Sequence, residues 1–244
     1  MTVCRLLPTT AASGPWNMAA DEALQRSAVD RGVATLRFYT WAQPTLSLGY
    51  FQAHADRRTD PHLATVAWVR RHTGGAAILH HHEITYALAL PAGSPWHTAE
   101  SWLCRFHHAV AAALEQFGAR TRAVVCGEDK KLGPFLCFQH QTPGDLLAEG
   151  HKVVGSAQRR PHGAMMQHGS ILLRRSPHAP VLPGLADLTG VTIDGDSLVG
   201  GIVAELKAET GWAFEPAGWT AEERGLAAEI EREKYGSAAW NEKR

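Results

Sequence analysis

The sequence predicts an α/β protein built on a mixed β-sheet. Segments with the apolar spacing of helices alternate with short apolar segments rich in β-branched and aromatic residues. Several neighbouring strand candidates are joined by links of hairpin length, which suit antiparallel pairs and are too short for a parallel crossover. Because no internal repeat, low-complexity tract or linker interrupts the 244 residues, we expect one domain spanning residues 1–244.

The first third of the chain predicts one helix followed by several strands. Asn17 is expected to cap a helix that Gly32 ends, since these residue types are preferred at the two ends of helices. Apolar and β-branched residues then predict strands. These strands cover residues 34–41, 45–51, 65–71 and 76–90, the last as a long strand or hairpin arm.

The rest of the chain predicts three helices and further strands. One helix carries apolar residues at helical spacing from Leu103 and ends at Gly118, and another ends at Gly211. Thr220 and Glu223 form a capping box for the last helix. The strand candidates lie in residues 122–138, which include a charged turn, and in residues 151–160 and 164–175, which a short turn joins.

Composition excludes several classes of function. The 24 basic and 24 acidic residues balance, so no overall field attracts nucleic acid or anionic lipid. No apolar run reaches the roughly 18 to 20 residues of a membrane span, and residues 1–9 lack the features of a secretory signal. The four cysteines have no metal-ligand spacing. We expect a cytoplasmic protein with free thiols that binds neither nucleic acid nor membrane.

Two arginines and a glycine pair interrupt the apolar pattern early in the chain. Arg70 and Arg71 precede Thr73, Gly74 and Gly75. Glycine allows close approach of another group to the backbone, and a guanidinium beside exposed N–H groups can bind phosphate or carboxylate. The segment lacks the Gly-Lys-Ser/Thr ending of a P-loop. It indicates either a substrate pocket or an ordinary hairpin turn.

Three consecutive histidines follow the glycine pair. Strand residues alternate between faces, so His80 and His82 are expected on one side, and His81 with Glu83 on the other. Two histidines could begin a metal site, but no Cys, Asp or Glu is obviously placed to complete it. We therefore expect no metal here, and a surface or pocket-lining role.

A cysteine and a lysine in the second half could carry chemistry. Cys137 lies fifteen positions before Lys152. A buried, inert thiol and a solvated strand lysine are the alternatives. If Lys152 or His140 lies beside Cys137 in the fold, the thiolate would be favoured and Cys137 would become a nucleophile.

Several motifs in order resemble the biotin/lipoate protein ligase superfamily. They are "NMAADEAL", "LRFYTWAQPTLSLGYFQ", "RRHTGG", "EITYAL", "GHKVVGSAQRR", "MQHGSILL" and "KYGSAAWN". The resemblance implies a largely antiparallel mixed sheet flanked by helices, with a tunnel for an eight-carbon acyl chain. It implies that Lys152 contacts the acyl carbonyl. The pocket residues that it implies are Arg70, Arg71, Thr73, Gly74, Gly75, His80, Gly155, Ser156, Ala157, His168 and Gly169.

The segment before Lys152 resembles the cysteine-dependent octanoyltransferase branch. Leu136, Cys137 and Phe138 stand where that branch has Ala-Cys-Phe. The resemblance implies that Cys137 takes an octanoyl group from octanoyl-acyl carrier protein and passes it to a lysine. The acceptor would be a lipoyl domain of a 2-oxoacid dehydrogenase or the glycine-cleavage H protein. No cofactor is required, and His80 or His168 is the candidate base. Because the chain ends near "KYGSAAWN", no C-terminal accessory domain is expected.

Three alternatives stay open at this point. The first is the catalytic subunit of a lipoate–protein ligase, which needs ATP and magnesium and in which Cys137 is structural. The second is an amidotransferase that moves octanoyl or lipoyl groups between carrier proteins. The third is a non-catalytic acyl-binding module, suggested by two departures from the family. His81 stands where aspartate is usual, and Ala76 where Gly or Arg is common.

Overall fold

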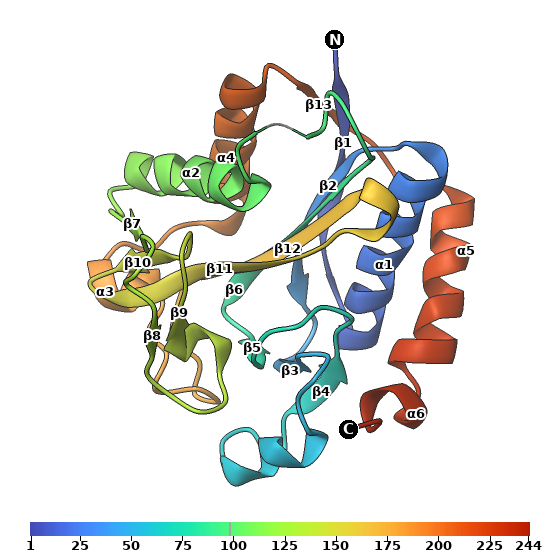
Figure 1. The fold of residues 1–244 in the computed structure, drawn as a ribbon. Coiled ribbons are helices and arrows are strands. Elements are labelled where there is room, and N and C mark those ends of the chain that lie inside the picture. Colours follow the sequence, from blue (N-terminus) through green and yellow to red (C-terminus); the bar gives the residue numbers. More distant parts are fainter. Residues whose placement is uncertain (98) are drawn as a thin grey trace.

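The computed structural model describes residues 1–97 and 99–244 and is organised around an eight-stranded sheet. The strand order is β13-β1-β2-β6-β12-β11-β10-β7 (Figure 1). Strand β1 pairs in parallel with β2 and β13, and the other pairs are antiparallel, so the predicted mixed, largely antiparallel sheet is confirmed. The strands are β1 (Val3–Ala12), β2 (Thr35–Trp41), β6 (Glu83–Leu90), β7 (Arg122–Ala123), β10 (Leu146–Ala148), β11 (His151–Arg159), β12 (Met165–Leu172) and β13 (Ala213–Pro216).

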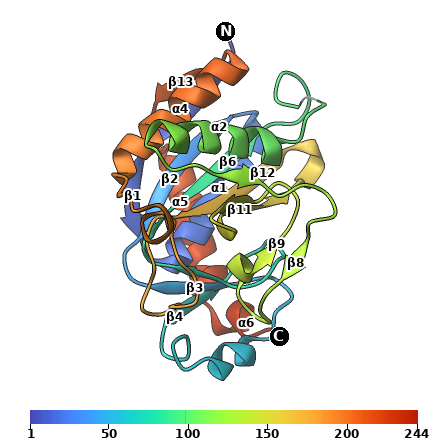
Figure 2. The ribbon, with the colours of Figure 1, turned by 90° about the vertical axis from the view of Figure 1, so that its left-hand side faces the viewer.

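Helices cover both faces of the sheet (Figure 1, Figure 2). Successive side chains of a strand point to opposite faces. In β6, Tyr86 and Leu88 therefore pack with α2 and α4, while Ala87 and Ala89 pack with α1 and α5. The helices are α1 (Gly14–Arg31), α2 (Trp102–Gln116), α3 (Leu185–Thr189), α4 (Gly195–Thr210), α5 (Ala221–Ile230) and α6 (Ala238–Asn241). Among the described helices, none is long and apolar enough to cross a bilayer.

A second, three-stranded sheet has the order β4-β3-β5 and lies near the C-terminus, low in Figure 1. It contains β3 (Thr45–Leu48), β4 (Ala67–Arg70) and β5 (Ile78–His80). Residues 76–90 are thus not one long strand, because the chain bends at His81 and His82 and leaves the small sheet for the large one. Strands β8 (Lys130–Lys131) and β9 (His140–Gln141) form a separate pair. The short helices are η1 (His54–Thr59), η2 (Cys137–Gln139), η3 (Pro161–Gly163) and η4 (Glu231–Tyr235).

Several helix ends agree with prediction, and the start of α1 does not. Gly32 and Gly211 close α1 and α4 in the left-handed conformation that glycine adopts most easily. Thr220 and Glu223 form the expected capping box of α5. The start of α1 was predicted wrongly. Ser13 accepts the capping hydrogen bond from Trp16 N, and Asn17 lies buried inside the helix.

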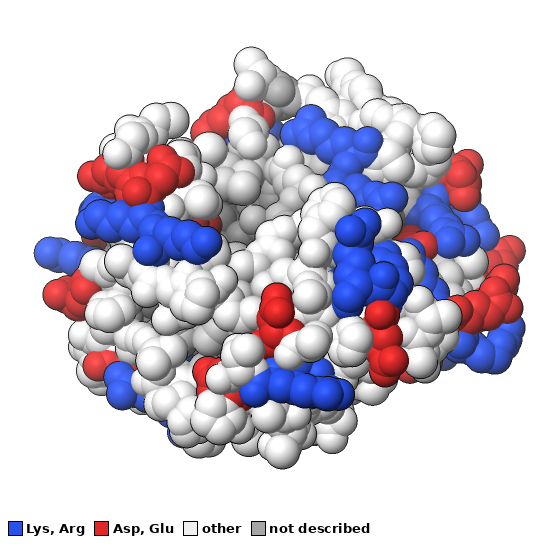
Figure 3. All heavy atoms as spheres, turned by 60° about the horizontal axis from the view of Figure 1, so that its bottom comes forward, with Lys and Arg blue, Asp and Glu red and all other residues white. Residues whose placement is uncertain are grey.

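The distribution of charged side chains on the surface agrees with the balanced composition. On the face shown in Figure 3, acidic and basic side chains are interspersed. An interspersed surface creates no extended field of one sign.

An acid-sensitive contact joins the C-terminal segment to α1. Glu22 Oε2 lies 2.6 Å from Lys234 Nζ and accepts a hydrogen bond of 2.7 Å from the Tyr235 hydroxyl. Burial alone would raise the pKa of Glu22, but the hydrogen bonds and charge of these partners lower it from 4.5 to about 2. A lowering of this size corresponds to about 3 kcal/mol of stability.

We expect this contribution to be complete above the unfolded-state pKa of Glu22 and to disappear as the pH falls toward 2. The Glu22→Gln variant should therefore have a lower free energy of unfolding at pH 7, and a shallower decline of that energy between pH 4.5 and about 2. Urea denaturation at a series of pH values measures both. Glu229→Gln, at an exposed position of α5, is the control. An unchanged decline in Glu22→Gln would contradict the assignment.

Candidate active site

A cavity of about 320 Å³ is lined by residues of β3, β5, β11, β12 and η2. This volume falls in the range of roughly 300 to 1,000 Å³ that is typical of small-molecule sites. The structure brings most of the predicted site residues to this cavity. They are Arg71, Gly74, Gly75, Cys137, His80, Lys152, Gly155, Ser156, Ala157, His168 and Gly169.

Cys137 and Lys152 lie side by side at the cavity. Lys152 Nζ is 3.8 Å from Cys137 Sγ, 3.1 Å from the carbonyl oxygen of His140 and 2.7 Å from Asp145 Oδ2. The Lys152 and Asp145 side chains are 3% and 4% exposed. The imidazole of His140 instead contacts the carbonyl oxygen of Gly133. Of the two partners considered for Cys137, the structure therefore places the lysine ammonium beside the sulfur.

Backbone contacts hold this pair in place. Cys137 N donates to the carbonyl oxygen of Ala77 at 2.7 Å, which fixes η2 against the segment before β5. Asp145 accepts from both the backbone N and the hydroxyl of Thr142, at 2.8 and 3.0 Å. A side chain at Gly155 would lie within 2.9 Å of Lys152 Nζ. Glycine at that position thus leaves room for the ammonium.

Arg71 shapes the loop at the cavity edge. Its guanidinium donates to the carbonyl oxygens of Ser47, Gly74 and Ala76 at 2.7 to 2.9 Å. Burial lowers the pKa of Arg71 to about 10, and attraction to Cys137 partly opposes that effect. Arg71 therefore stays cationic at neutral pH, and it orders the glycine segment by binding its carbonyl groups. Gly75 has a φ of 91°, which favours glycine.

Two predicted pocket residues do not line the cavity. Arg70 is fully buried, and its guanidinium contacts the β3 exit loop and the C-terminal segment. It donates to the carbonyl oxygens of Gly49, Tyr50, Gln52 and Asn241. Thr73 lies next to a residue of the cavity lining, because its hydroxyl is 2.8 Å from His168 Nε2. The structure thus places Arg70 outside the cavity lining, where it anchors the C-terminal segment, and its role in substrate binding stays a prediction.

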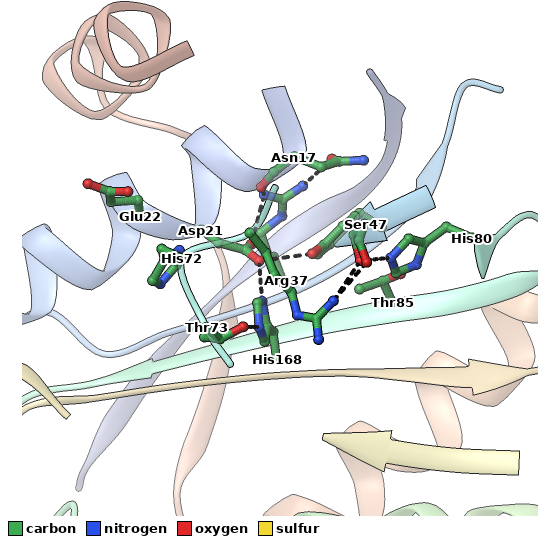
Figure 4. A network of polar contacts seen from close by, with 12 residues as sticks. Asn17, Asp21, Glu22, Arg37, Ser47, His72, Thr73, His80, Thr85 and His168 are labelled. Atoms are coloured by element: carbon green, nitrogen blue, oxygen red, sulfur yellow. Dashed lines mark hydrogen bonds and ion pairs between the residues drawn. The ribbon is translucent and has the colours of Figure 1, made fainter. Parts of the chain in front are cut away.

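His80 lines the cavity and forms a buried pair with Glu83. Figure 4 shows His80 beside Ser47 and Thr85. His80 Nδ1 lies 2.5 Å from Glu83 Oε1, and Nε2 lies 2.8 Å from the hydroxyl of Ser47. The imidazole stacks on Trp41 with 3.8 Å between ring centroids. The predicted alternation of faces was wrong, because the chain turns after His80. Glu83 pairs with His80, while His81 stacks on His82 instead.

A second histidine–carboxylate pair lies nearby (Figure 4). His168 Nδ1 is 3.1 Å from Asp21 Oδ2. Asp21 also forms a buried ion pair with Arg37 at 3.2 Å and accepts from the Tyr39 hydroxyl at 2.9 Å. The negative charge of the Asp21 carboxylate is therefore already compensated by the Arg37 guanidinium.

The comparison with protein-family models decides the family. Residues 13–179 match the lipoyl protein ligase A/B catalytic domain. The chain belongs to this family.

Similar proteins agree with membership of the lipoyl protein ligase A/B family. Octanoyltransferase LipM of Kyrpidia tusciae is 33% identical, with 99% of each chain covered, and that of Moorella thermoacetica is 32% identical, with 98% covered. Among solved structures, a putative lipoate protein ligase from T. acidophilum has a TM-score of 0.81 at 22% identity, covering 100% of both chains. Lipoate-protein ligase A bound with ATP has a TM-score of 0.76 at 20% identity, with 99% of each chain covered. These structural likenesses show the fold.

Sequence reasoning missed four polar residues of this lipoyl protein ligase site. They are Asp21, Ser47, Glu83 and Asp145. Asn17 and Asp21 are four positions apart on α1, which places them on one helix face, and this spacing was a usable signal. The pairing of Asp145 with Lys152 had no such signal, because it depends on the turn between them. Within the described residues, no cluster of three or more His, Cys, Asp or Glu is placed to hold a metal ion.

Proposed function

We propose that this chain is an octanoyltransferase of protein lipoylation that carries the acyl group on Cys137. The observation that carries the proposal is the 3.8 Å distance between Lys152 Nζ and Cys137 Sγ at the wall of the cavity. An ammonium at this distance stabilises negative charge on the sulfur, which is the form that attacks an acyl group. The 30 to 33% identity to octanoyltransferases over nearly the whole chain supports the acyl group and the reaction.

The first step transfers the acyl group to the enzyme. The Cys137 thiolate attacks the thioester carbonyl of octanoyl-acyl carrier protein, and the carrier thiolate leaves. Lys152 stabilises the oxygen that becomes negative in the transition state. Cavity residues such as Ile78, Ala157 and Phe138 offer apolar contacts to the octanoyl chain. Burial of each methylene group contributes roughly 0.8 kcal/mol to the binding free energy.

The second step transfers the acyl group to a protein lysine. The ε-amine of a lipoyl domain, or of the glycine-cleavage H protein, attacks the Cys137 thioester and forms an amide. Exchange between thioesters is close to neutral in free energy, and conversion of a thioester to an amide is downhill. The proposed route therefore needs neither ATP nor magnesium.

The test supplies each donor separately. We expect octanoyl-acyl carrier protein alone to give a hydroxylamine-labile octanoyl adduct on the protein, seen by mass spectrometry, and then to label a lipoyl domain. Free lipoate or octanoate with ATP and magnesium should label neither. Labelling that requires ATP and releases AMP would select the ligase alternative. Labelling only from an octanoylated carrier protein, such as octanoyl-H protein, would select the amidotransferase. Binding of octanoate without turnover would select the acyl-binding module.

A further inference from the structure

The second step of the proposed reaction needs a proton acceptor. A lysine side chain has an unperturbed pKa of about 10.4, so the incoming amine arrives protonated and must lose a proton before it can attack. Lys152 is badly placed for this role. Its ammonium donates to the carbonyl oxygen of His140 and to Cys137 Sγ and forms an ion pair with Asp145, so it is already engaged as a cation.

Among the residues that the structure describes, three imidazoles line the cavity, and their hydrogen-bond and ion-pair partners distinguish them. His140 contacts a backbone carbonyl oxygen, which adds no negative charge. His168 pairs with Asp21, whose charge Arg37 already compensates. His80 pairs with Glu83, and in the described part of the chain no Lys or Arg forms an ion pair with that carboxylate.

The Glu83 carboxylate is almost completely enclosed. Its side chain is 1% exposed, and that of His80 is 4% exposed. Oε1 accepts from the Thr85 hydroxyl as well as contacting His80, whereas Oε2 is buried and has no hydrogen-bond partner among the described residues. A buried carboxylate is costly without an opposite charge nearby. An imidazolium at His80 would supply that charge at 2.5 Å, so the geometry selects this pair as the candidate proton acceptor of the cavity.

A hydroxyl connects the pair to the cavity. Ser47 lines the cavity, and its Oγ lies 2.8 Å from His80 Nε2 and accepts from Arg71 Nη1 at 3.2 Å. With Nδ1–H directed at Glu83, Nε2 is the acceptor and the Ser47 hydroxyl donates to it. This is the hydrogen-bond order of a hydroxyl–imidazole–carboxylate triad.

We propose that Ser47, His80 and Glu83 form the proton relay that neutralises the acceptor lysine. This inference rests on the proposed function and assigns a role within its second step. The substrate ammonium gives one proton to Ser47 Oγ as the hydroxyl proton of Ser47 moves to His80 Nε2. The neutral amine then attacks the octanoyl-Cys137 carbonyl, the C–N bond forms and the C–S bond breaks. The second amine proton leaves with the Cys137 sulfur, and the imidazolium pairs with Glu83 until solvent takes its proton.

The test separates the two steps and varies the nucleophile. Octanoyl-Cys137 enzyme is formed first, quantified by mass spectrometry, and then mixed either with a lipoyl domain or with hydroxylamine. Hydroxylamine is already neutral at neutral pH, so it needs no base to lose a proton. We expect His80→Gln still to form the acyl-enzyme, which shows that the site is assembled. Its transfer to the lipoyl domain should slow by about 10²- to 10⁴-fold. Its reaction with hydroxylamine should slow far less than its transfer to the lipoyl domain.

Two further variants test the hydroxyl of the relay and provide a control. Ser47→Ala, which removes the hydroxyl and leaves the His80–Glu83 pair in place, should show the same selective loss. His82→Gln changes the neighbouring histidine of the same run, which does not line the cavity, and should behave as wild type with both nucleophiles.

Equal slowing with both nucleophiles, or no slowing in His80→Gln, would overturn the relay. The same holds if His168→Gln alone shows the amine-selective loss. Failure of the wild type to form the acyl-enzyme would instead overturn the proposed function, and the relay with it.

Discussion

Replacing Cys137 with alanine is expected to abolish octanoyl transfer, with a loss on the order of 10⁴-fold or more. The reason is that the proposed route passes through a covalent bond to this sulfur, and no binding contact can substitute for it. In the described part of the chain, Cys137 is the cysteine placed beside a lysine ammonium. Cys137→Ser should also fail, because a serine hydroxyl remains un-ionised at neutral pH and is a far weaker nucleophile.

The matched control is Cys126→Ala. Cys126 is exposed and does not line the cavity, so its replacement should leave the transfer rate unchanged. The measurement is octanoylation of a lipoyl domain from octanoyl-acyl carrier protein, with intact-mass detection of the enzyme adduct. Full activity of Cys137→Ala in the presence of ATP would show that the sulfur is structural.

Replacing Lys152 with methionine is expected to damage both stability and activity. The change leaves Asp145, whose side chain is 4% exposed, without its cation. Breaking a buried ion pair from one side costs about 3–5 kcal/mol. Loss of the charge beside the reacting carbonyl should also slow transfer by about 10²- to 10³-fold. Urea denaturation and the octanoyl-transfer assay measure the two effects.

A double variant separates these two effects. Lys152→Met with Asp145→Asn removes the uncompensated charge while the amide oxygen still accepts from Thr142, so most of the lost stability should return. Activity should not return, because the ammonium is still absent. Lys130→Met, at an exposed position on β8, controls for the loss of a lysine. A double variant no more stable than Lys152→Met alone would contradict the ion-pair argument.

Much of the fold follows from local signals. The left-handed glycines after α1 and α4, the capping box of α5 and the hairpin of β11 and β12 each depend on a few adjacent residues. Such signals are visible in the sequence because their physical cause lies within one turn of the chain. Strands β1 and β13 were not predicted. Both pair in parallel at one side of the sheet, and their partners are distant in the sequence.

The sequence predicted which residues form the site better than it predicted what each residue does there. The ordered motifs placed Cys137, Lys152 and the glycine segment in one pocket, and the structure agrees. Adjacent arginines, however, have different roles that no spacing reveals. Arg71 lines the cavity, whereas Arg70 binds the carbonyl oxygen of Asn241, which lies 171 positions along the chain. The sequence pattern of two arginines before a glycine pair does not show which of the two guanidinium groups lines the cavity.

The sequence by itself determined the fold class, the glycine ends of α1 and α4, the capped start of α5 and the set of residues that could react, because periodicity, capping and residue chemistry act over short distances. Only the tertiary structure decided which groups meet. Lys152 reaches Cys137 because Gly155 leaves space and Asp145 directs the ammonium, and His80 meets Glu83 because the chain bends between two sheets. These contacts depend on where the backbone travels, and burial then multiplies the effect of each charge that it brings together.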